Sequence, residues 1–312
     1  MKPKIIVVCG PTASGKTRLA IELAKVLNGE IISADSMQIY KELNIGTAKP
    51  TVCEMSGVPH FLIDIVSVAS IKSDEFFNVA EYVRLANACA DDIISRGKVP
   101  IVCGGTGLYI DNFINNTRFA ESENDFEYRK YLDGFSSEEL HDMLSEIDPK
   151  SAETIHANNK KRIIRALEIY KITGKTKAET DAQSRLAESE YDFVKFGLQY
   201  SERDLLYSRI DKRVDIMIES GLLSEVENLL EYEANIRRIG AIGYVEILDY
   251  LCGIHSFDEA VEMIKRNTRR YAKRQITWFK RDTATNWIDV TDMNEQNIED
   301  YVHNIVKCLK NI

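Results

Sequence analysis

The residues with the clearest chemical potential lie near the start of the chain, in the segment GPTASGKT. Its spacing fits the pattern G-x-x-x-x-G-K-[ST], in which two glycines let the backbone curl so that its N–H groups point inward at a phosphate. Lys16 adds a full positive charge, and the Thr17 hydroxyl can ligate Mg²⁺. The pattern does not distinguish a nucleoside triphosphate from a diphosphate bound to Mg²⁺. The sequence therefore predicts a phosphate-binding loop that consists of Gly10, Pro11, Thr12, Ala13, Ser14, Gly15, Lys16 and Thr17.

Two more polar segments follow apolar runs. Asp35 comes directly after Glu30–Ala34, and a glycine-rich turn that contains Thr106 follows Val99–Cys103. Ligands bind over the carboxyl ends of strands in open parallel sheets, so we expect both segments beside the phosphate loop. Asp35 could ligate Mg²⁺ through water, act as a general base, or only cap a turn. The glycines could mark a close approach to a ligand or only a tight turn.

The elements that must position these residues alternate between strand and helix patterns in the first third of the chain. Alternation of this kind favours a parallel sheet with right-handed crossovers. Gly97 is placed to end the longest of these helices. In chain order we expect strand Lys4–Gly10, helix Lys16–Leu27, strand Glu30–Ala34, helix Ser73–Arg96 and strand Val99–Gly105.

The middle of the chain, about residues 119–190, is polar and helix-like and shows no convincing strand pattern. A strand pattern returns at Phe193–Tyr200, and a last short strand at Trp287–Val290 precedes a terminal helix. We therefore expect an α/β core formed by residues 1–118 and about 191–312, interrupted by a helical insertion.

The bulk composition is that of a soluble globular protein. The chain has 312 residues, of which 44% are hydrophobic and 29% are charged. No apolar run approaches the roughly 18 residues that a membrane-spanning helix needs, and the six cysteines show no paired or metal-binding spacing. We expect a cytoplasmic protein with reduced thiols and no membrane partner. A formal net charge of −9 argues against non-specific coating of nucleic acid, although it does not exclude a local basic patch.

One basic segment contrasts with this acidic total. Thr268–Arg281 holds six Lys or Arg residues, three aromatic residues and no carboxylate. The preceding Ser256–Glu259 has the form of a capping box, so a helix should begin there. At 100° per residue, cations gather on one side of this helix and apolar residues gather on the other. The basic side comprises Arg266, Arg270, Lys273, Lys280 and Arg281, and the apolar side comprises Val261, Ile264, Ala272, Ile276 and Phe279.

Several motifs occur in a fixed order along nearly the whole chain. They are GPTASGKT, ADSMQIYKELNIGTAKP, GVPHFLID, GGTGLYI, RIIRALEIYKITGK, AIGYVE and YAKRQITWFKR. In this order they closely resemble the tRNA dimethylallyltransferases, also called tRNA isopentenyltransferases. The resemblance implies a P-loop NTPase-like parallel sheet flanked by helices, with a mainly helical inserted domain. It also implies transfer of the dimethylallyl group of dimethylallyl diphosphate to N6 of adenine 37, next to the anticodon, in tRNAs reading codons that begin with U.

The same resemblance implies roles for individual residues. Asp35 would be the general base that takes a proton from N6, and Thr106 would lie near the adenine and the diphosphate. Lys16, together with Mg²⁺, would neutralise the departing diphosphate. Arg209 would be a second neutralising group, although Arg213, four residues later on the same helical face, remains an open alternative.

Four segments match those that the family uses on the anticodon stem-loop of tRNA. The adenine must leave its stack to react, and unpaired bases are held by aromatic side chains and cations. Val245 stands where the family usually has a lysine, and Arg237 and Arg238 could substitute for it. The implied tRNA-binding residues are Asp35, Ser36, Met37 and Gln38; Lys161, Arg162, Ile163, Ile164 and Arg165; Gly240, Ala241, Ile242, Gly243, Tyr244 and Val245; and Lys273, Arg274, Gln275, Ile276, Thr277, Trp278, Phe279 and Lys280.

Three other interpretations share some of these features. The chain could prenylate free adenine nucleotides, phosphorylate a small molecule with ATP, or bind RNA through a vestigial phosphate loop. The helical insertion and KRQITWFKR favour tRNA over a free nucleotide, and Asp35 beside an intact loop argues against a vestigial site. We expect a monomer, while the sequence leaves open the set of tRNAs, the rates and any later modification of the prenyl group.

Overall fold

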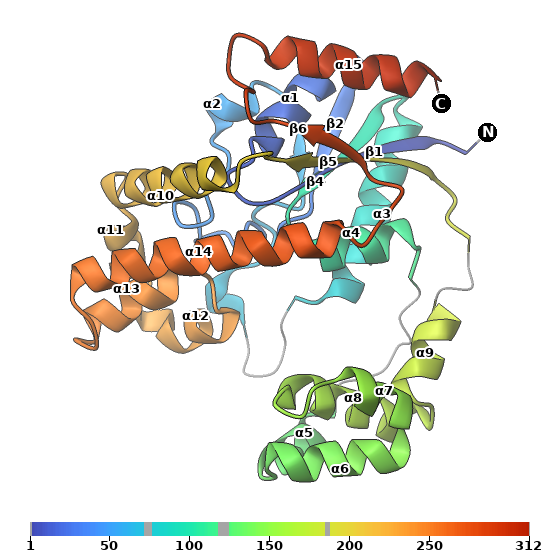
Figure 1. The fold of residues 1–312 in the computed structure, drawn as a ribbon, viewed down its shortest axis with the longest axis vertical. Coiled ribbons are helices and arrows are strands. Elements are labelled where there is room, and N and C mark those ends of the chain that lie inside the picture. Colours follow the sequence, from blue (N-terminus) through green and yellow to red (C-terminus); the bar gives the residue numbers. More distant parts are fainter. Residues whose placement is uncertain (1, 72–76, 118–124, 185–187, 312) are drawn as a thin grey trace. The chain divides into compact units, whose positions relative to one another are not determined.

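The computed structural model describes residues 2–71, 77–117, 125–184 and 188–311. The chain forms two compact units, whose elements are labelled in Figure 1. The first unit contains Met1–Ile114 and Glu190–Ile312. The second contains Asn115–Ser189, where the sequence analysis expected a helical insertion at about residues 119–190.

The first unit is built on one parallel sheet of six strands in the order β3-β2-β4-β1-β5-β6. Because the strands are parallel, the carboxyl ends of β2, β4 and β1 lie next to one another at one edge of the sheet. This arrangement confirms the predicted α/β fold. The strands are β1 Lys4–Cys9, β2 Gly29–Ser33, β3 His60–Phe61, β4 Val99–Gly104, β5 Asp192–Gln199 and β6 Asn286–Asp289.

Helices cover both faces of this sheet. Successive side chains of a strand point to opposite faces, so each strand packs against helices on both sides. Ile6 and Val8 of β1 pack with α1 and α15, whereas Ile5 and Val7 pack with α3 and α4. The last residue of α14, Phe279, joins the second of these two clusters. These helices are α1 Lys16–Leu27, α3 Val79–Ser95, α4 Gly107–Ile114, α14 Phe257–Phe279 and α15 Ile298–Asn311.

A third cluster of buried side chains joins the segment after β2 to helices of the C-terminal half. Leu43 of that segment packs in one cluster with Val214, Tyr244 and Ile264. This cluster fixes the segment after β2 against α10, α13 and α14. The helices here are α10 Arg203–Glu219, α11 Leu222–Glu227, α12 Glu233–Ile239 and α13 Tyr244–Leu251, with the short helices η1 Val68–Ser70 and η2 Leu230–Tyr232. The short helix α2 Val52–Met55 has no buried residue and lies outside this cluster.

The described residues of the second unit form helices and no strand. Their apolar core includes Leu144 and Ile163. Glu168 is fully buried and accepts hydrogen bonds from Arg129 at 2.7 Å and from Arg165 at 2.6 Å, so its charge is compensated inside the unit. The helices are α5 Phe126–Asp133, α6 Ser137–Ile147, α7 Pro149–Thr154, α8 Lys160–Thr173 and α9 Lys177–Ser184.

Most predicted core elements are confirmed, and the differences lie mainly at their ends. The helix expected at Ser73–Arg96 begins only at Val79, because the Asn78 side chain accepts the Glu81 N–H at 3.0 Å and caps the helix there. Residues 73–76 of that prediction lie outside the described residues. The two-residue strand β3 was not expected. Within the described ranges, no helix is both long enough and apolar enough to cross a membrane.

Candidate active site

The predicted phosphate loop joins β1 to α1. Gly15 precedes α1 with a φ of 81°, in the left-handed region that favours glycine. A Cβ on Gly10 would lie 3.0 Å from the Leu198 carbonyl oxygen, so a side chain there would crowd β5. The loop therefore delivers Lys16 and Thr17 to the first turn of α1, where backbone N–H groups and the helix dipole favour an anion.

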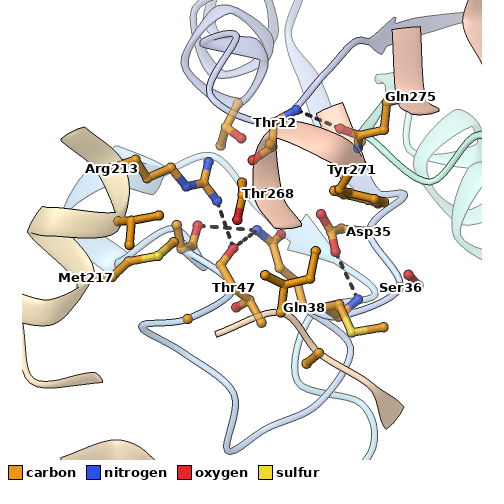
Figure 2. Close-up of a pocket in the computed structure, with 18 of the residues that line it drawn as sticks. Thr12, Asp35, Ser36, Gln38, Thr47, Arg213, Met217, Thr268, Tyr271 and Gln275 are labelled. Atoms are coloured by element: carbon orange, nitrogen blue, oxygen red, sulfur yellow. Dashed lines mark hydrogen bonds between the residues drawn. The ribbon is translucent and has the colours of Figure 1, made fainter. Parts of the chain in front are cut away.

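A pocket of about 260 Å³ opens beside this loop (Figure 2). Its lining combines the loop with the ends of β2 and β4, one side of α10, the turn before α13 and the middle of α14. The charged groups in this lining are Lys16, Asp35, Arg213 and Arg274. Three cations around one carboxylate suit a ligand that carries negative charge.

Asp35 lies just beyond the carboxyl end of β2 and is held by its own turn. Its Oδ1 accepts the Met37 N–H at 2.9 Å (Figure 2). The Thr106 hydroxyl accepts the Ser36 N–H at 3.0 Å, and the Thr106 N–H donates to the Ala34 carbonyl oxygen at 3.0 Å. These bonds tie the end of β2 to the end of β4. The structure therefore brings Asp35 and Thr106 together, as the position of their strands predicted.

The structure separates Arg209 from Arg213, which the sequence could not do. Arg213 lines the pocket and donates to the Thr47 carbonyl oxygen at 3.3 Å (Figure 2). Arg209 is exposed and is absent from the pocket lining, and its Nε donates to the Ala13 carbonyl oxygen at 3.3 Å. The geometry therefore favours Arg213 over Arg209 for the predicted diphosphate-neutralising role, which stays a prediction.

Lys16 and Arg213 are poorly compensated by the protein. Neither forms an ion pair with an Asp or Glu among the residues that the structure describes. Burial lowers the pKa of Lys16 below its usual value, and the Arg213 charge lowers it further while Asp35 opposes the change. Burial also lowers the pKa of Arg213, again opposed by Asp35. A lowered pKa of a basic group means that the protein solvates its positive charge less well than water does. An anionic ligand would therefore stabilise the charges of both residues.

The pocket also offers oxygen ligands that suit Mg²⁺. The Thr17 hydroxyl and the Asp35 carboxylate both belong to its lining. Protein-bound Mg²⁺ usually takes one or two protein oxygens and completes its shell with phosphate oxygens and water. In the described part of the chain, no three His, Cys, Asp or Glu side chains gather into a metal site of their own. The residues therefore fit a Mg²⁺ ion that binds together with a phosphate group.

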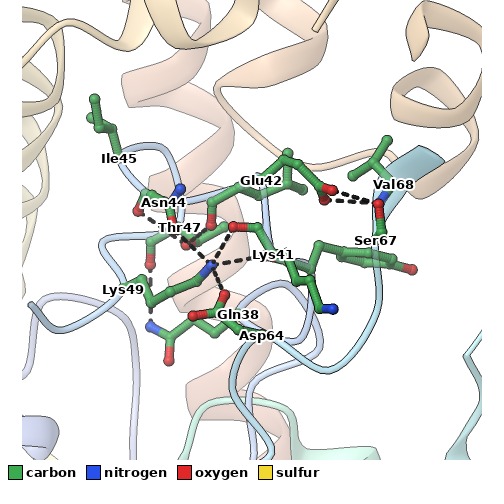
Figure 3. Close-up of polar contacts among 12 residues, drawn as sticks. Gln38, Lys41, Glu42, Asn44, Ile45, Thr47, Lys49, Asp64, Ser67 and Val68 are labelled. Carbon is green, nitrogen blue, oxygen red and sulfur yellow. Dashed lines mark hydrogen bonds and ion pairs between the residues drawn. The ribbon is translucent and has the colours of Figure 1, made fainter. Parts of the chain in front are cut away.

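Lys49 organises the segment that follows β2 (Figure 3). Its Nζ donates to the Tyr40 carbonyl oxygen at 2.8 Å and to Asn44 Oδ1 at 2.8 Å, and it pairs with Asp64 Oδ1 at 2.5 Å. Only 6% of the Lys49 side chain is exposed, so its charge is buried among these acceptors. Lys49 therefore acts as the internal cross-link of this segment.

The Thr47 carbonyl oxygen is the point where two pocket residues meet. It accepts from Gln38 Nε2 and from Arg213 Nη2, each at 3.3 Å (Figure 2). Gln38 Nε2 also donates to the Ala48 carbonyl oxygen at 3.3 Å, which fixes the orientation of the amide. The position of Thr47 thus sets the positions of both Gln38 and Arg213.

Glu225 of α11 holds the same segment from the other side, and the sequence analysis missed it. The Glu225 carboxylate accepts the N–H groups of Ile45 at 3.0 Å and Gly46 at 3.4 Å, and the Tyr244 hydroxyl at 2.5 Å. The Tyr244 oxygen in turn accepts the Gly46 N–H at 3.2 Å. Tyr244, predicted as a tRNA contact, is fully buried, so we assign its side chain to positioning this segment. About 180 residues separate Glu225 from its backbone partners, and no local pattern marks such a contact.

Helix α14 begins at the capping box predicted at Ser256–Glu259. On its predicted apolar side Ile264, Ala272 and Phe279 are buried, whereas Val261 and Ile276 are only partly buried. Gln275 on that side is also buried. Its Oε1 accepts the Thr12 N–H at 2.9 Å, and its Nε2 donates to the Gly105 carbonyl oxygen at 2.9 Å. Gln275 therefore links the phosphate loop to the turn after β4. Phe279 is buried in the core, whereas Gln275 also lines the pocket (Figure 2). The tRNA contacts expected at these two positions stay predictions.

The two remaining aromatic residues of Thr268–Arg281 are Tyr271 and Trp278. Tyr271 lines the pocket (Figure 2). Trp278 Nε1 donates to Asp111 Oδ2 at 2.7 Å, and the indole ring packs so closely on Gly107 that a Cβ there would lie 2.2 Å from it. The predicted tRNA-binding residues of this segment that are exposed are Lys273, Arg274, Thr277 and Lys280.

The other two predicted tRNA-binding segments are partly buried. In α8, Ile163 and Ile164 belong to the core of the second unit, and Arg165 forms an ion pair within that unit. The exposed cations of α8 at this place are Lys161 and Arg162.

The segment before α13 contributes to the pocket through its backbone turn, with Gly240, Ala241 and Ile242 in the lining. Arg237, considered as a substitute for the lysine missing at position 245, pairs with Glu233 at 2.7 Å and with Asp249 at 2.6 Å. These two ion pairs commit its guanidinium to the protein.

These features first define a class, namely a parallel α/β protein with a predicted phosphate loop after β1 and a carboxylate after β2, whose carboxyl ends are separated by that of β4. A family model described as IPP transferase matches residues 38–282 of the chain. The chain belongs to the IPP transferase family, which confirms the resemblance found in its sequence motifs.

Individual relatives and solved structures agree with this family. A tRNA dimethylallyltransferase of Acetivibrio thermocellus is 50% identical over 303 residues, which cover 95% of each chain. One from Halalkalibacterium halodurans is 46% identical and covers 98% of this chain and 97% of its own. The crystal structure of the full-length tRNA isopentenylpyrophosphate transferase from Bacillus halodurans matches with a TM-score of 0.72 at 44% identity, over 99% and 98% of the two chains. A eukaryotic dimethylallyltransferase acting on tRNA matches with a TM-score of 0.81 at 31% identity, over 95% of this chain and 76% of that one.

Proposed function

We propose that this chain transfers the dimethylallyl group of dimethylallyl diphosphate to N6 of the adenine at position 37, next to the anticodon, in tRNAs that read codons beginning with U. The products are N6-(dimethylallyl)adenosine in the tRNA and free diphosphate. The observation that carries the proposal is the pocket in which Lys16 of the phosphate loop, the uncompensated Arg213 and the Asp35 carboxylate line one space.

The cations of the pocket account for the leaving group. An allylic C–O bond breaks as negative charge develops on the diphosphate, and charges that are already fixed in place stabilise it without rearrangement. Lys16, the N–H groups of the loop and Arg213 supply this stabilisation. A Mg²⁺ ion held through the Thr17 hydroxyl would neutralise the same phosphate oxygens as a Lewis acid.

Asp35 accounts for the activation of the nucleophile. The lone pair of N6 is delocalised into the adenine ring, so N6 attacks weakly unless a base accepts its proton as the new bond forms. The Met37 N–H occupies Oδ1 of Asp35 and orients the carboxylate, which leaves Oδ2 to take that proton. In the transfer the N6–carbon bond forms, the C–O bond breaks with its electron pair leaving on the diphosphate, and one proton moves to Asp35.

The tRNA must present its adenine outside the stacked anticodon loop, at a cost of a few kcal/mol. The exposed cations of α14 and α8 are suited to hold the RNA backbone, and they include Lys273, Lys280, Lys161 and Arg162. We propose that the second unit, residues 115–189, serves as a tRNA-contacting domain. We also propose that the protein acts as a monomer in the cytoplasm, where its six free cysteines would remain reduced.

Purified protein incubated with labelled dimethylallyl diphosphate, Mg²⁺ and unmodified tRNA tests this proposal. We expect label on adenine 37 of the tRNA and release of diphosphate, with loss of transfer when the metal is chelated. Label on AMP but not on tRNA would refute the tRNA substrate and support a free-nucleotide prenyltransferase. Phosphate transfer from ATP to a small acceptor, without prenyl transfer, would support a kinase instead.

A further inference from the structure

A second hollow of the first unit lies between α10 and α14, and we call it the α10–α14 groove. Its volume is about 460 Å³. Four of its lining side chains are cations, namely Arg203 at the start of α10 and Lys273, Lys280 and Arg281 along and just after the end of α14. All four are exposed, and the groove lining contains no Asp or Glu. The groove therefore concentrates positive charge on a chain whose formal net charge is −9.

Other cations at the contact between α10 and α14 are paired. Arg269 lies 2.5 Å from Asp211, and Lys265 lies 2.8 Å from Asp215, so these two pairs join the helices. Over the described ranges, no carboxylate forms an ion pair with any of the four groove cations. The contact between the two helices thus uses Lys265 and Arg269 of α14. The four cations of the groove remain available to a ligand.

Two of the four groove cations also lie against aromatic rings. The Arg203 guanidinium lies 5.5 Å from the centre of the Tyr207 ring, and the Arg281 guanidinium lies 5.3 Å from the Trp278 ring. Such cation–π contacts orient a planar guanidinium while leaving its N–H groups free to donate. An oriented guanidinium is well matched to the two oxygens of a phosphate.

Helix α14 connects this groove to the pocket. Tyr271 lines the pocket, whereas Lys273 and Lys280 line the groove on another side of the same helix. Lys280 lies nine positions after Tyr271, a separation of roughly 13 Å along the helix axis. One nucleic-acid strand can therefore place a base in the pocket and neighbouring backbone phosphates in the groove.

We propose that the α10–α14 groove binds backbone phosphates of the tRNA substrate, with Arg203 and Tyr207 of α10 forming one wall of the site. The family resemblance points only to the α14 side, through Lys273 and Lys280. The identity of the RNA rests on the proposed function, whereas the phosphate chemistry rests on the groove itself.

Binding of a fluorescent anticodon stem-loop RNA to the full chain, measured at several salt concentrations, tests this site. Each phosphate contact contributes roughly 0.7 to 0.9 to the slope of log K against log salt, which corresponds to about six-fold in affinity at ~0.1 M salt. We expect Arg203→Ala to lose the equivalent of about one phosphate contact, both in the salt slope and in the affinity for the stem-loop. Arg203→Lys should keep most of that contact. The matched control is Lys307→Ala, which removes an exposed cation from α15 on the opposite face of the sheet.

Measuring prenyl transfer by the same variants distinguishes a role of the groove in tRNA binding from a role of the pocket in the chemical step. Arg203→Ala should raise the KM for tRNA while leaving kcat and the KM for dimethylallyl diphosphate unchanged. An affinity and a salt slope equal to those of the unmodified chain would overturn the groove as a phosphate site. If the unmodified chain binds the stem-loop through Arg203 but transfers no prenyl group, the groove stands and the proposed function fails.

Discussion

Replacing Arg213 by Gln tests the electrostatic account of the pocket most directly. Arg213 lines the pocket without a carboxylate partner in the described part of the chain, and burial lowers its pKa, so little else in the protein compensates its charge. Two unit charges about 4 Å apart interact by roughly 4 kcal/mol at an effective dielectric constant of 20. Part of that energy is present before the C–O bond breaks, so the expected loss is about 10²- to 10³-fold in kcat, similar to the loss of one oxyanion donor.

The substitution should leave the fold intact. Arg213 donates to the Thr47 carbonyl oxygen, but that oxygen also accepts from Gln38 at 3.3 Å and so keeps a partner. The matched control is Arg209→Gln, one turn away on α10, whose side chain is exposed and outside the pocket. Exposed charges typically contribute up to about 1 kcal/mol, so the kcat of the control variant should fall by no more than about five-fold.

Single-turnover transfer of labelled dimethylallyl groups, with tRNA saturating, measures both variants. Product inhibition by diphosphate provides a second measurement, because Arg213→Gln should weaken diphosphate binding whereas Arg209→Gln should not. A large loss in Arg209→Gln together with normal turnover in Arg213→Gln would refute the assignment made from the pocket geometry.

Three further changes test other parts of the molecule. Asp35→Asn should lower kcat roughly 10²- to 10⁴-fold while tRNA and diphosphate still bind, because the amide oxygen can accept the Met37 N–H; normal turnover would exclude Asp35 as the base. Tyr244→Phe should lower the free energy of unfolding in urea by about 1–3 kcal/mol and also reduce turnover, because Glu225 loses a charged hydrogen bond; unchanged values would show that this clamp is dispensable. Hydrogen bonds from two basic neighbours, Arg96 first, hold the pKa of buried Glu30 at about 2 instead of 4.5. The stability that Glu30 contributes is therefore present above pH 4.5 and lost as the pH falls toward 2, and Glu30→Gln should remove this part of the pH dependence in urea titrations.

Short stretches of sequence were sufficient to predict much of the core. The helix Lys16–Leu27 has the bounds expected from apolar periodicity, and the glycine-rich loop precedes it directly, as its spacing predicted. The capping box at Ser256–Glu259 correctly marked the start of α14. Each of these features depends on residues within one or two turns of one another, so the local chain contains the necessary information.

The choice between Arg209 and Arg213 shows where periodicity becomes insufficient. Four residues on a helix advance by 400°, so the two side chains differ by only about 40° in direction and share one face. Packing of α10 against the segment after β2 decides that Arg213 reaches the Thr47 carbonyl oxygen and the pocket. No pattern within α10 contains that information.

The sequence by itself determined the glycine-rich loop after β1, the carboxylate after β2 and the basic side of one long helix. The tertiary structure alone decided that Gln275 joins Thr12 to the turn after β4, across 263 residues of chain, and that Glu225 clamps the segment that carries Thr47. It also decided which α14 side chains face the pocket, the interior or the α10–α14 groove. The physical reason is that such contacts depend on how distant helices pack against the sheet, and local residue patterns do not specify that packing.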